Sequence, residues 1–218
     1  MNVLDHGHCR LVNHMGDDLS IVRAARVSYD ADWRTGEDEG KDAKLIWYLM
    51  RNHHTSPFES VTFTFDVKAP IFVFRQWHRH RTWSFNEVSA RYLELPEEFY
   101  VPGLVGIQSS YNKQMRLLEK NPHEEAIRQV IGVQCQEAFN TYRQLLSLGA
   151  PRELARGVLP LNTYSHMFAT VNLHNLFHFI RLRLHEHAQY EIQLYAQAML
   201  NQIRAIVPVS VAAFEETL

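Results

Sequence analysis

The chain has 218 residues, 46% of them hydrophobic, and a formal net charge of −2 at pH 7. This length and composition predict a single domain, residues 1–218, with a sizeable core. The charge excludes a general attraction to nucleic acid, so any anion-binding site must be local. Cys9 and Cys135 are too few for a disulfide framework and fit a reducing compartment.

The first residues, MNVLDHGHCRL, lack a positive region followed by an apolar run. No apolar stretch approaches the ~18 residues of a membrane-spanning helix. We therefore expect a cytoplasmic protein that does not associate with membranes.

The first third of the chain predicts two helices and a strand. Asp18 is placed to cap a helix over residues 18–28, and a second helix is expected over 43–52. The acidic, glycine-containing run 30–42 between them is typical of an exposed loop. Over 60–67, apolar and polar residues alternate strictly, which predicts a strand with one buried face.

Pro70 suits the first position of a helix in which Ile71, Phe74 and Trp77 form the buried side. This helix should run into an irregular loop. The remaining expected elements are a polar helix over 109–119, a long helix over 122–149, a short helix after Pro151, a strand over 159–171, a helix capped by Asn172, and a helix over 190–206 that Pro208 breaks. The fold class predicted is α+β: a helix-rich domain with a small, mostly antiparallel central sheet flanked by helices.

Residues 70–91 read PIFVFRQWHRHRTWSFNEVSAR and combine four arginines with a single acid, Glu87. Guanidinium groups bind phosphates and carboxylates through paired hydrogen bonds, and a lone carboxylate accepts from a sugar hydroxyl or ring N–H. Phenylalanine and tryptophan residues are interleaved with these polar side chains, which favours the wall of a cleft over a solvated turn. The segment therefore predicts a site for a polyanion.

Thirteen histidines invite a metal hypothesis. His174 and His178 have the i, i+4 spacing of a zinc-binding helix, but no glutamate lies between them. Two further pairs, His78/His80 and His185/His187, lack companion cysteine or aspartate ligands at recognisable spacing. We expect no bound metal.

Within the arginine-rich segment, RHRTWSFNEVSAR (79–91) resembles the signature RHRxxSxNExSxR of the flavin-dependent thymidylate synthases, with all eight specified positions filled. The flanking stretches 54–60, 65–77 and 152–164 and the helix after Asn172 are similar too. The resemblance implies methylation of dUMP to dTMP, with 5,10-methylenetetrahydrofolate as carbon donor, NADPH as reductant and FAD as hydride relay. It also implies a homotetramer with active sites where subunits meet.

The resemblance assigns ligand contacts position by position. Positions similar to flavin contacts are Ser56, Arg79, His80, Arg81, Glu87, Asn172, His174 and His178, with Ser28, His54 and Glu59 as neighbours. Positions similar to dUMP contacts are Gln76, His78, Arg79, Glu87, Ser89, Arg91, Arg156 and Arg183. His174 stands where many family members have arginine, so its contact with the flavin is open.

Arg183 resembles the residue that polarises the uracil ring. Loss of the N3 proton moves negative charge onto C5, and a guanidinium about 4 Å away stabilises that charge by about 4 kcal/mol, about three pKa units. The alternative is covalent activation by a cysteine that adds to C6. Cys135 lies inside the long helix, and Cys9 lies in the N-terminal segment without the basic surroundings that stabilise a thiolate, so we expect no protein nucleophile.

The helix after Asn172 carries polar groups on two opposite faces. One face holds His174, His178, Arg181 and His185, and Arg183 lies nearly opposite. This pattern predicts a helix between subunits, unless it breaks near Arg181 or its Arg/His face is merely solvated. Two other functions stay open from the sequence: a single-stranded nucleic-acid-binding module and a flavin oxidase without methyl transfer.

Overall fold

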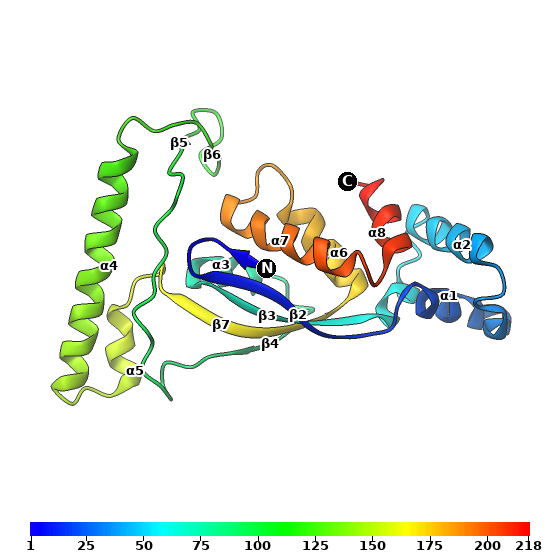
Figure 1. Ribbon diagram of the computed structural model, residues 1–218, viewed down its shortest axis with the longest axis horizontal. Coiled ribbons are helices and arrows are strands. Elements are labelled where there is room, and N and C mark those ends of the chain that lie inside the picture. Colours follow the sequence, from blue (N-terminus) through cyan, green and yellow to red (C-terminus); the bar gives the residue numbers. More distant parts are fainter.

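The computed structural model describes residues 1–218, and its centre is a five-stranded antiparallel sheet in the order β1-β2-β3-β7-β4 (Figure 1). The strands are β1 Asn2–Val3, β2 Gly7–Met15, β3 Thr62–Pro70, β7 Tyr164–Asn172 and β4 Ser84–Glu87. A separate hairpin joins β5 Ile107–Gln108 to β6 Arg116–Leu117. The predicted α+β class is confirmed.

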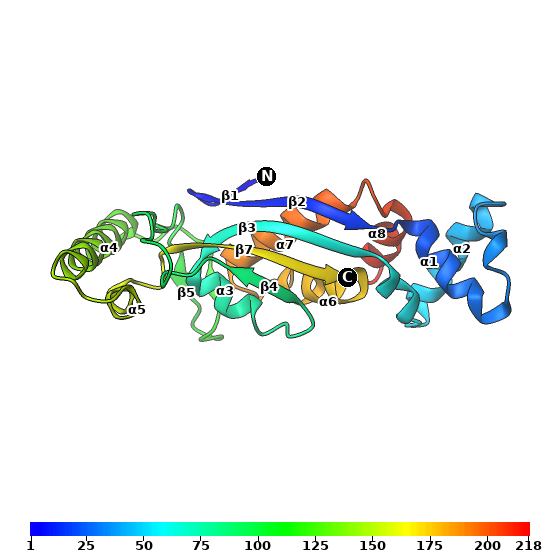
Figure 2. The same ribbon diagram turned by 90° about the horizontal axis from the view of Figure 1, so that it is seen from below.

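Eight α-helices accompany the sheet: α1 Asp18–Arg26, α2 Glu39–Arg51, α3 Ile71–Trp77, α4 Glu124–Ser147, α5 Arg152–Ala155, α6 Leu173–Arg183, α7 Tyr190–Ile203 and α8 Pro208–Glu215. Helices α6 and α7 cover one face of the sheet, while α1 and α2 lie at one end and α4 and α5 at the other (Figure 1). The opposite face carries no helix (Figure 2). None of the helices combines the length and the apolar character needed to cross a bilayer.

The strand predicted over 60–67 is confirmed and extends to Pro70. Phe63, Phe65 and Val67 are fully buried against the helices, while Thr64 and Asp66 point to the uncovered face. Strand β2 was not predicted. Its register with β3 shifts between Leu11 and Asn13, which disrupts the alternation that would reveal a strand.

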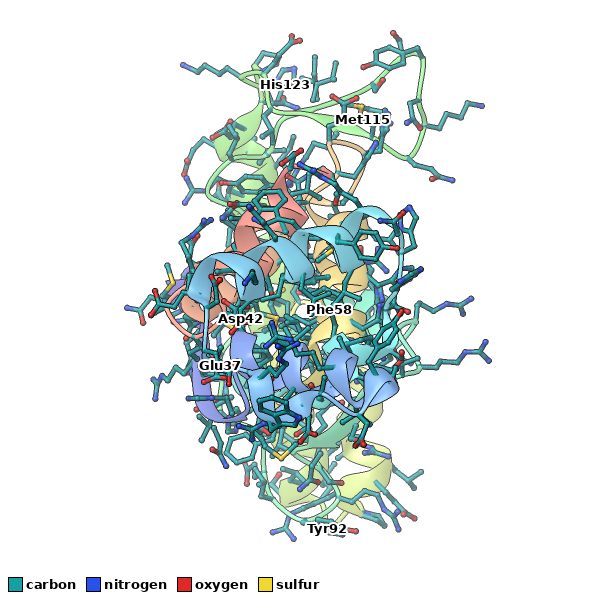
Figure 3. The ribbon with its side chains drawn as sticks, turned by 90° about the vertical axis from the view of Figure 1, so that its right-hand side faces the viewer. Glu37, Asp42, Phe58, Tyr92, Met115 and His123 are labelled. Carbon is teal, nitrogen blue, oxygen red and sulfur yellow. The ribbon has the colours of Figure 1, made fainter.

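Two predictions near the N-terminus need correction. Asp17, not Asp18, caps α1 by accepting a hydrogen bond from the backbone N–H of Ser20. Asp18 instead accepts hydrogen bonds from Val209 and Ser210 at the start of α8. Helix α2 begins at Glu39 within the predicted loop, because the Asp38 side chain caps it by accepting a hydrogen bond from the backbone N–H of Lys41. Asp42, in its first turn, is buried between α1 and α2 and pairs with Arg26 at 2.5 Å (Figure 3).

The prediction that Pro70 opens a helix is off by one position: it pairs with Tyr164 as the last residue of β3 and precedes α3. The second half of the arginine-rich segment is not an irregular loop but contains strand β4, which pairs with β7. In β4 only Phe85 has a partly buried side chain, so the sequence shows no apolar alternation there.

The predictions for the second half are partly wrong. Residues 109–119 form no helix but belong to the β5–β6 hairpin region, and β7 begins at Tyr164 rather than at 159. Helix α7 ends at Ile203, and Pro208 begins the unpredicted α8, which fits the preference of proline for a first helical position. Helix α6 ends at Arg183, so His185 lies beyond the face assigned to it.

Candidate active site

The aromatic residues of the 70–91 segment anchor it in the core. Trp77 is fully buried and stacks on Phe179 of α6 with ring centroids 4.8 Å apart, and Trp83 packs edge-on against Trp77. These rings are not the cleft wall that the sequence suggested. Of the five phenylalanine and tryptophan residues in the segment, only Phe74 lines one of the cavities described below. They fix α3 and the turn after it, so the polar side chains between them start from a rigid base.

A first cavity of about 510 Å³ lies beside α3 and β4. Its polar lining includes His78, Glu87 and Arg156, three of the predicted dUMP contacts. Ser89 and Arg91 do not line it, although the Arg91 Nε lies 3.7 Å from the carboxylate of Glu153, which does. The structure therefore gathers three of the eight predicted dUMP contacts around one cavity, with Arg91 beside it.

Glu87 is held in that cavity by Ser165, which sequence reasoning missed. The Ser165 hydroxyl donates to Glu87 Oε1 at 2.6 Å, and His78 Nε2 lies 3.8 Å from Oε2. Ser165 is 5% exposed and lies on β7. No motif contains it. Only the pairing of β7 with β3 and β4 brings this hydroxyl to the carboxylate, so the sequence held no direct signal.

A second cavity of about 700 Å³ lies on the other side of the turn after α3, and its lining is almost entirely polar. The lining residues are Arg79, His80, Arg81, Thr82, His174, Asn175, His178, Leu182 and Arg183. Five of the eight predicted flavin contacts are thus gathered. Arg79 and Arg81 are exposed and make no ion pair within the chain, so both guanidinium groups are available to an anion.

Arg183 is oriented by two acceptors. Its Nε donates to His80 Nε2 at 3.0 Å, and its Nη2 donates to the carbonyl oxygen of Gln76 at 3.0 Å. Burial, together with the nearby Arg183 and His178, lowers the pKa of His80 to about 4. Burial also lowers the pKa of Arg183, but arginine starts so high that its side chain stays charged at neutral pH.

The other predicted flavin residues lie outside the second cavity. Ser56, with Ser28 and His54, lines a hollow of about 400 Å³ at the α1–α2 end of the chain. A smaller hollow of about 130 Å³ lies between this hollow and the second cavity, and His174 and His178 line both it and the second cavity. Glu87 lines the first cavity instead, and Glu59 lines none of these hollows.

Asn172 acts as the helix cap that the sequence predicted. Its side chain accepts a hydrogen bond from the backbone N–H of Asn175 at 2.9 Å and a second from the Asn175 side chain. Its carboxamide oxygen is therefore occupied by α6, and only the side-chain NH₂ remains to donate to a ligand.

The predicted dUMP residues do not all come together. His78, Glu87 and Arg156 line the first cavity, whereas Arg183 and Arg79 line the second, and the two cavities share no lining residue. The Gln76 side chain contacts Gln189 and lines neither. Within one chain, Arg183 therefore does not line the cavity that holds His78, Glu87 and Arg156.

Neither cysteine has the environment of a nucleophile. Cys9 is fully buried, and its burial raises the pKa of the thiol to about 12. Cys135 is 4% exposed within α4, and burial raises its pKa as well. Neither lines the cavities described above, so the thiolate needed for addition to a pyrimidine is disfavoured at both positions.

Comparison with known proteins places the chain in a family. A sequence profile of the family described as "Thymidylate synthase complementing protein" (Thy1) matches residues 10–209. The chain is 53% identical over 219 residues to a flavin-dependent thymidylate synthase of Thermus thermophilus, covering 99% of this chain and 78% of that protein. It is 49% identical over 217 residues to the flavin-dependent thymidylate synthase of Treponema denticola, covering 98% and 80%.

A solved structure supports the same family membership. The fold matches the crystal structure of a UMP/dUMP methylase, PolB from Streptomyces cacaoi bound with 5-Br dUMP, with a TM-score of 0.91 and 37% identity over 99% of this chain and 97% of that one. The resemblance of residues 79–91 to the family signature is thus confirmed along nearly the whole chain. The chain belongs to the flavin-dependent thymidylate synthases, which methylate dUMP to dTMP.

Proposed function

We propose that this flavin-dependent thymidylate synthase binds dUMP in the first cavity and FAD in the second, at active sites that neighbouring copies of the chain complete. The enzyme uses 5,10-methylenetetrahydrofolate and NADPH with its FAD. The observation that carries the proposal is the separation of the predicted dUMP residues: Glu87 and Arg156 lie in one cavity, and Arg183 lies in the other.

The first cavity suits a nucleotide because it combines charge of both signs with an apolar wall. Half of its 14 lining residues are hydrophobic, which fits a pyrimidine ring. Arg156 and, at the rim, Ser89 and Arg91 are our proposed phosphate contacts. Glu87, with one oxygen held by Ser165, presents its other oxygen to a ring N–H or a sugar hydroxyl.

The second cavity fits the phosphates of FAD. Arg79 and Arg81 offer two uncompensated guanidinium groups, and His174 with Asn175 adds further donors. The small adjoining hollow adds the apolar side chains of Phe58 and Phe177. When bound, FAD supplies the relay of reducing equivalents from NADPH; the residues around it bind and orient the ligands.

Arg183 acts on the pyrimidine as a fixed positive charge. His80 Nε2 accepts the hydrogen bond from Arg183, so the neutral ring carries its proton on Nδ1. His80 and the Gln76 carbonyl together hold the guanidinium at two points and leave Nη1 to face the ligand. His80 is therefore a positioning residue for Arg183 as well as a flavin contact, and the proposal needs no protein nucleophile.

Self-association is supported by the uncovered face of the sheet. Phe168 on β7 is 45% exposed there and Met15 on β2 is 64% exposed, and a second copy packed on this face would remove both side chains from water. A homotetramer would cover such faces and bring the Arg183 of one chain to the first cavity of another. A cytoplasmic location stays our prediction, supported by two cysteines that form no disulfide.

Arg183→Gln should lower kcat about 1,000-fold while flavin absorbance is retained, because the loss of a charge about 4 Å from the ring removes about 4 kcal/mol of stabilisation. The kcat of Arg183→Lys should lie between those of the wild type and Arg183→Gln, since one ammonium group cannot reach both His80 and the Gln76 carbonyl. Steady-state kinetics with tritium release from labelled dUMP measures this. Arg23→Gln, exposed on α1 and lining none of the described cavities, is the control and should stay active; unchanged turnover in Arg183→Gln would refute the assigned role.

Ser165→Ala should raise KM for dUMP about tenfold, because Glu87 loses a charge-assisted hydrogen bond that orients it. Flavin content should not change, since Ser165 does not line the second cavity. Ser165→Thr keeps the hydroxyl and should restore most of the affinity. A wild-type KM in Ser165→Ala would show that Glu87 does not depend on this bond.

The pKa of His80, about 4 in the folded protein, lies below its ordinary value of 6.5, so on acidification the unfolded chain takes up this proton first. The free energy of unfolding should therefore fall as the pH decreases from about 6.5 to about 4. His80→Gln still accepts from Arg183 but does not titrate, so its melting temperature should depend less on pH over this interval. Thermal unfolding over this pH interval measures the dependence, and His14→Gln is the control for an exposed histidine. If the melting temperature of His80→Gln changed with pH as steeply as that of the wild type, the prediction would be wrong.

Mixed assemblies test whether sites are shared between chains. Arg156→Ala and Arg183→Gln, co-expressed with two different tags and purified through both, should recover up to about a quarter of wild-type turnover by random assembly of two-chain sites. Arg156→Ala mixed with Glu87→Gln, whose lesions lie in one cavity, is the matched control and should stay inactive. No recovery in the first mixture would place the whole dUMP site on one chain. Sedimentation analysis of the wild type gives the number of chains.

A further inference from the structure

Three potential metal ligands meet on the uncovered face of the sheet, away from both cavities. His8 Nε2 lies 2.9 Å from Asp66 Oδ1, and His166 Nε2 lies 2.5 Å from the same oxygen. The ligand atoms of the three residues all lie within 4.8 Å of one another. Each comes from a different strand, β2, β3 and β7, so spacing along the sequence did not reveal them.

The sheet register brings these residues together. His8 and His166 both pair with Lys68 on the strand between them, and Asp66 lies two residues along that strand on the same face. Behind them, Cys9, Val67 and Met167 are packed in the main core. The three backbone positions are therefore fixed by strand pairing and by burial of the reverse face, which is the preorganisation that a metal site requires.

The charges around the cluster favour a cation. The Lys68 ammonium is turned away to the Glu98 carboxylate at 2.5 Å, so that pair is neutral. Arg10, opposite Asp66 in the register, is exposed and makes no ion pair with it. With both imidazoles neutral, His8, Asp66 and His166 carry a net charge of −1.

We propose that His8, Asp66 and His166 form a binding site for a divalent transition-metal ion of the Zn²⁺ type. Two imidazole nitrogens and one carboxylate oxygen are ligands that Zn²⁺ and its neighbours prefer. Tetrahedral ligands about 2.0–2.1 Å from Zn²⁺ lie about 3.3 Å apart. Both imidazole–carboxylate distances would therefore lengthen by less than about 1 Å, and the two imidazole nitrogens, within 4.8 Å of each other, would adjust by up to about 1.5 Å. The fourth position is left to water or to a ligand from a neighbouring copy.

The bound ion would join β2 to β7 across β3, a span of about 10 Å. Its role is to tie the strands together, because none of its ligands lines the first or second cavity. The proposal is thus independent of the assignments of dUMP and FAD.

The test uses the full, flavin-loaded chain without a polyhistidine tag, freed of metal by chelation. Titration calorimetry with Zn²⁺, and visible absorption with Co²⁺ as a tetrahedral reporter, should give one site per chain at neutral pH. His166→Ala, at a half-exposed position that should not disturb folding, should weaken binding at least about tenfold. Asp66→Asn should do the same, and acidification should weaken wild-type binding because ligation needs neutral imidazoles.

His14→Ala removes an exposed histidine of the same strand outside the cluster and should leave the affinity unchanged. The melting temperature of wild type should rise with Zn²⁺ and that of His166→Ala should not. The proposal is overturned if His166→Ala binds Zn²⁺ with wild-type stoichiometry and affinity, or if wild type shows no Co²⁺ absorption.

Discussion

The pairing of β3 with β7 is the constraint on which the other features depend. Nine consecutive positions of the two strands are paired, from Thr62 opposite Asn172 to Pro70 opposite Tyr164. These strands are about a hundred residues apart in the chain, yet α3 starts where β3 ends and α6 starts where β7 ends. Their register therefore sets how the arginine-rich turn after α3 meets the arginine at the end of α6, and it fixes the His80–Arg183 bond.

The alternation of side chains along β7 divides the molecule into two chemical faces. Ser165 points to the side covered by helices and reaches Glu87, whereas His166, the next residue, points to the open side and reaches Asp66. Strand geometry forces neighbouring residues onto opposite faces. One strand thus contributes Ser165 to the first cavity, the proposed dUMP site, and His166 to the proposed metal cluster on the opposite face.

The sequence predicted the elements whose pattern is local and strong. Strand β3 alternates strictly, and α4 and α6 have clear helical spacing and end signals, so all three were found. Strand β4 and the β5–β6 hairpin have no such pattern, because long-range pairing rather than local alternation holds them. The polar helix predicted over 109–119 does not form, because that segment takes part in the β5–β6 pairing instead.

The candidate site residues also divide into those with a local sequence pattern and those brought together only by long-range pairing. The signature residues of 79–91 could be recognised by their fixed spacing, and half of the eight specified positions line the two cavities. Ser165 and the His8–Asp66–His166 cluster could not be found in this way. Their members belong to no motif and meet only through the sheet register, which a single sequence does not encode in any local pattern. The family resemblance put Arg183 and Glu87 among the contacts to one substrate. Only the structure shows that within one chain they line different cavities.

Arg79 and Arg81 are two cations two residues apart, held near His174 and Arg183 with no acid to balance them. Like charges so arranged repel one another, and this strain is relieved only when an anion arrives. In the proposed function, the phosphates of FAD would supply the missing counter-charge of this region. Under that assignment, removal of the flavin would leave the apoprotein with unbalanced positive charge at the turn that carries the family signature.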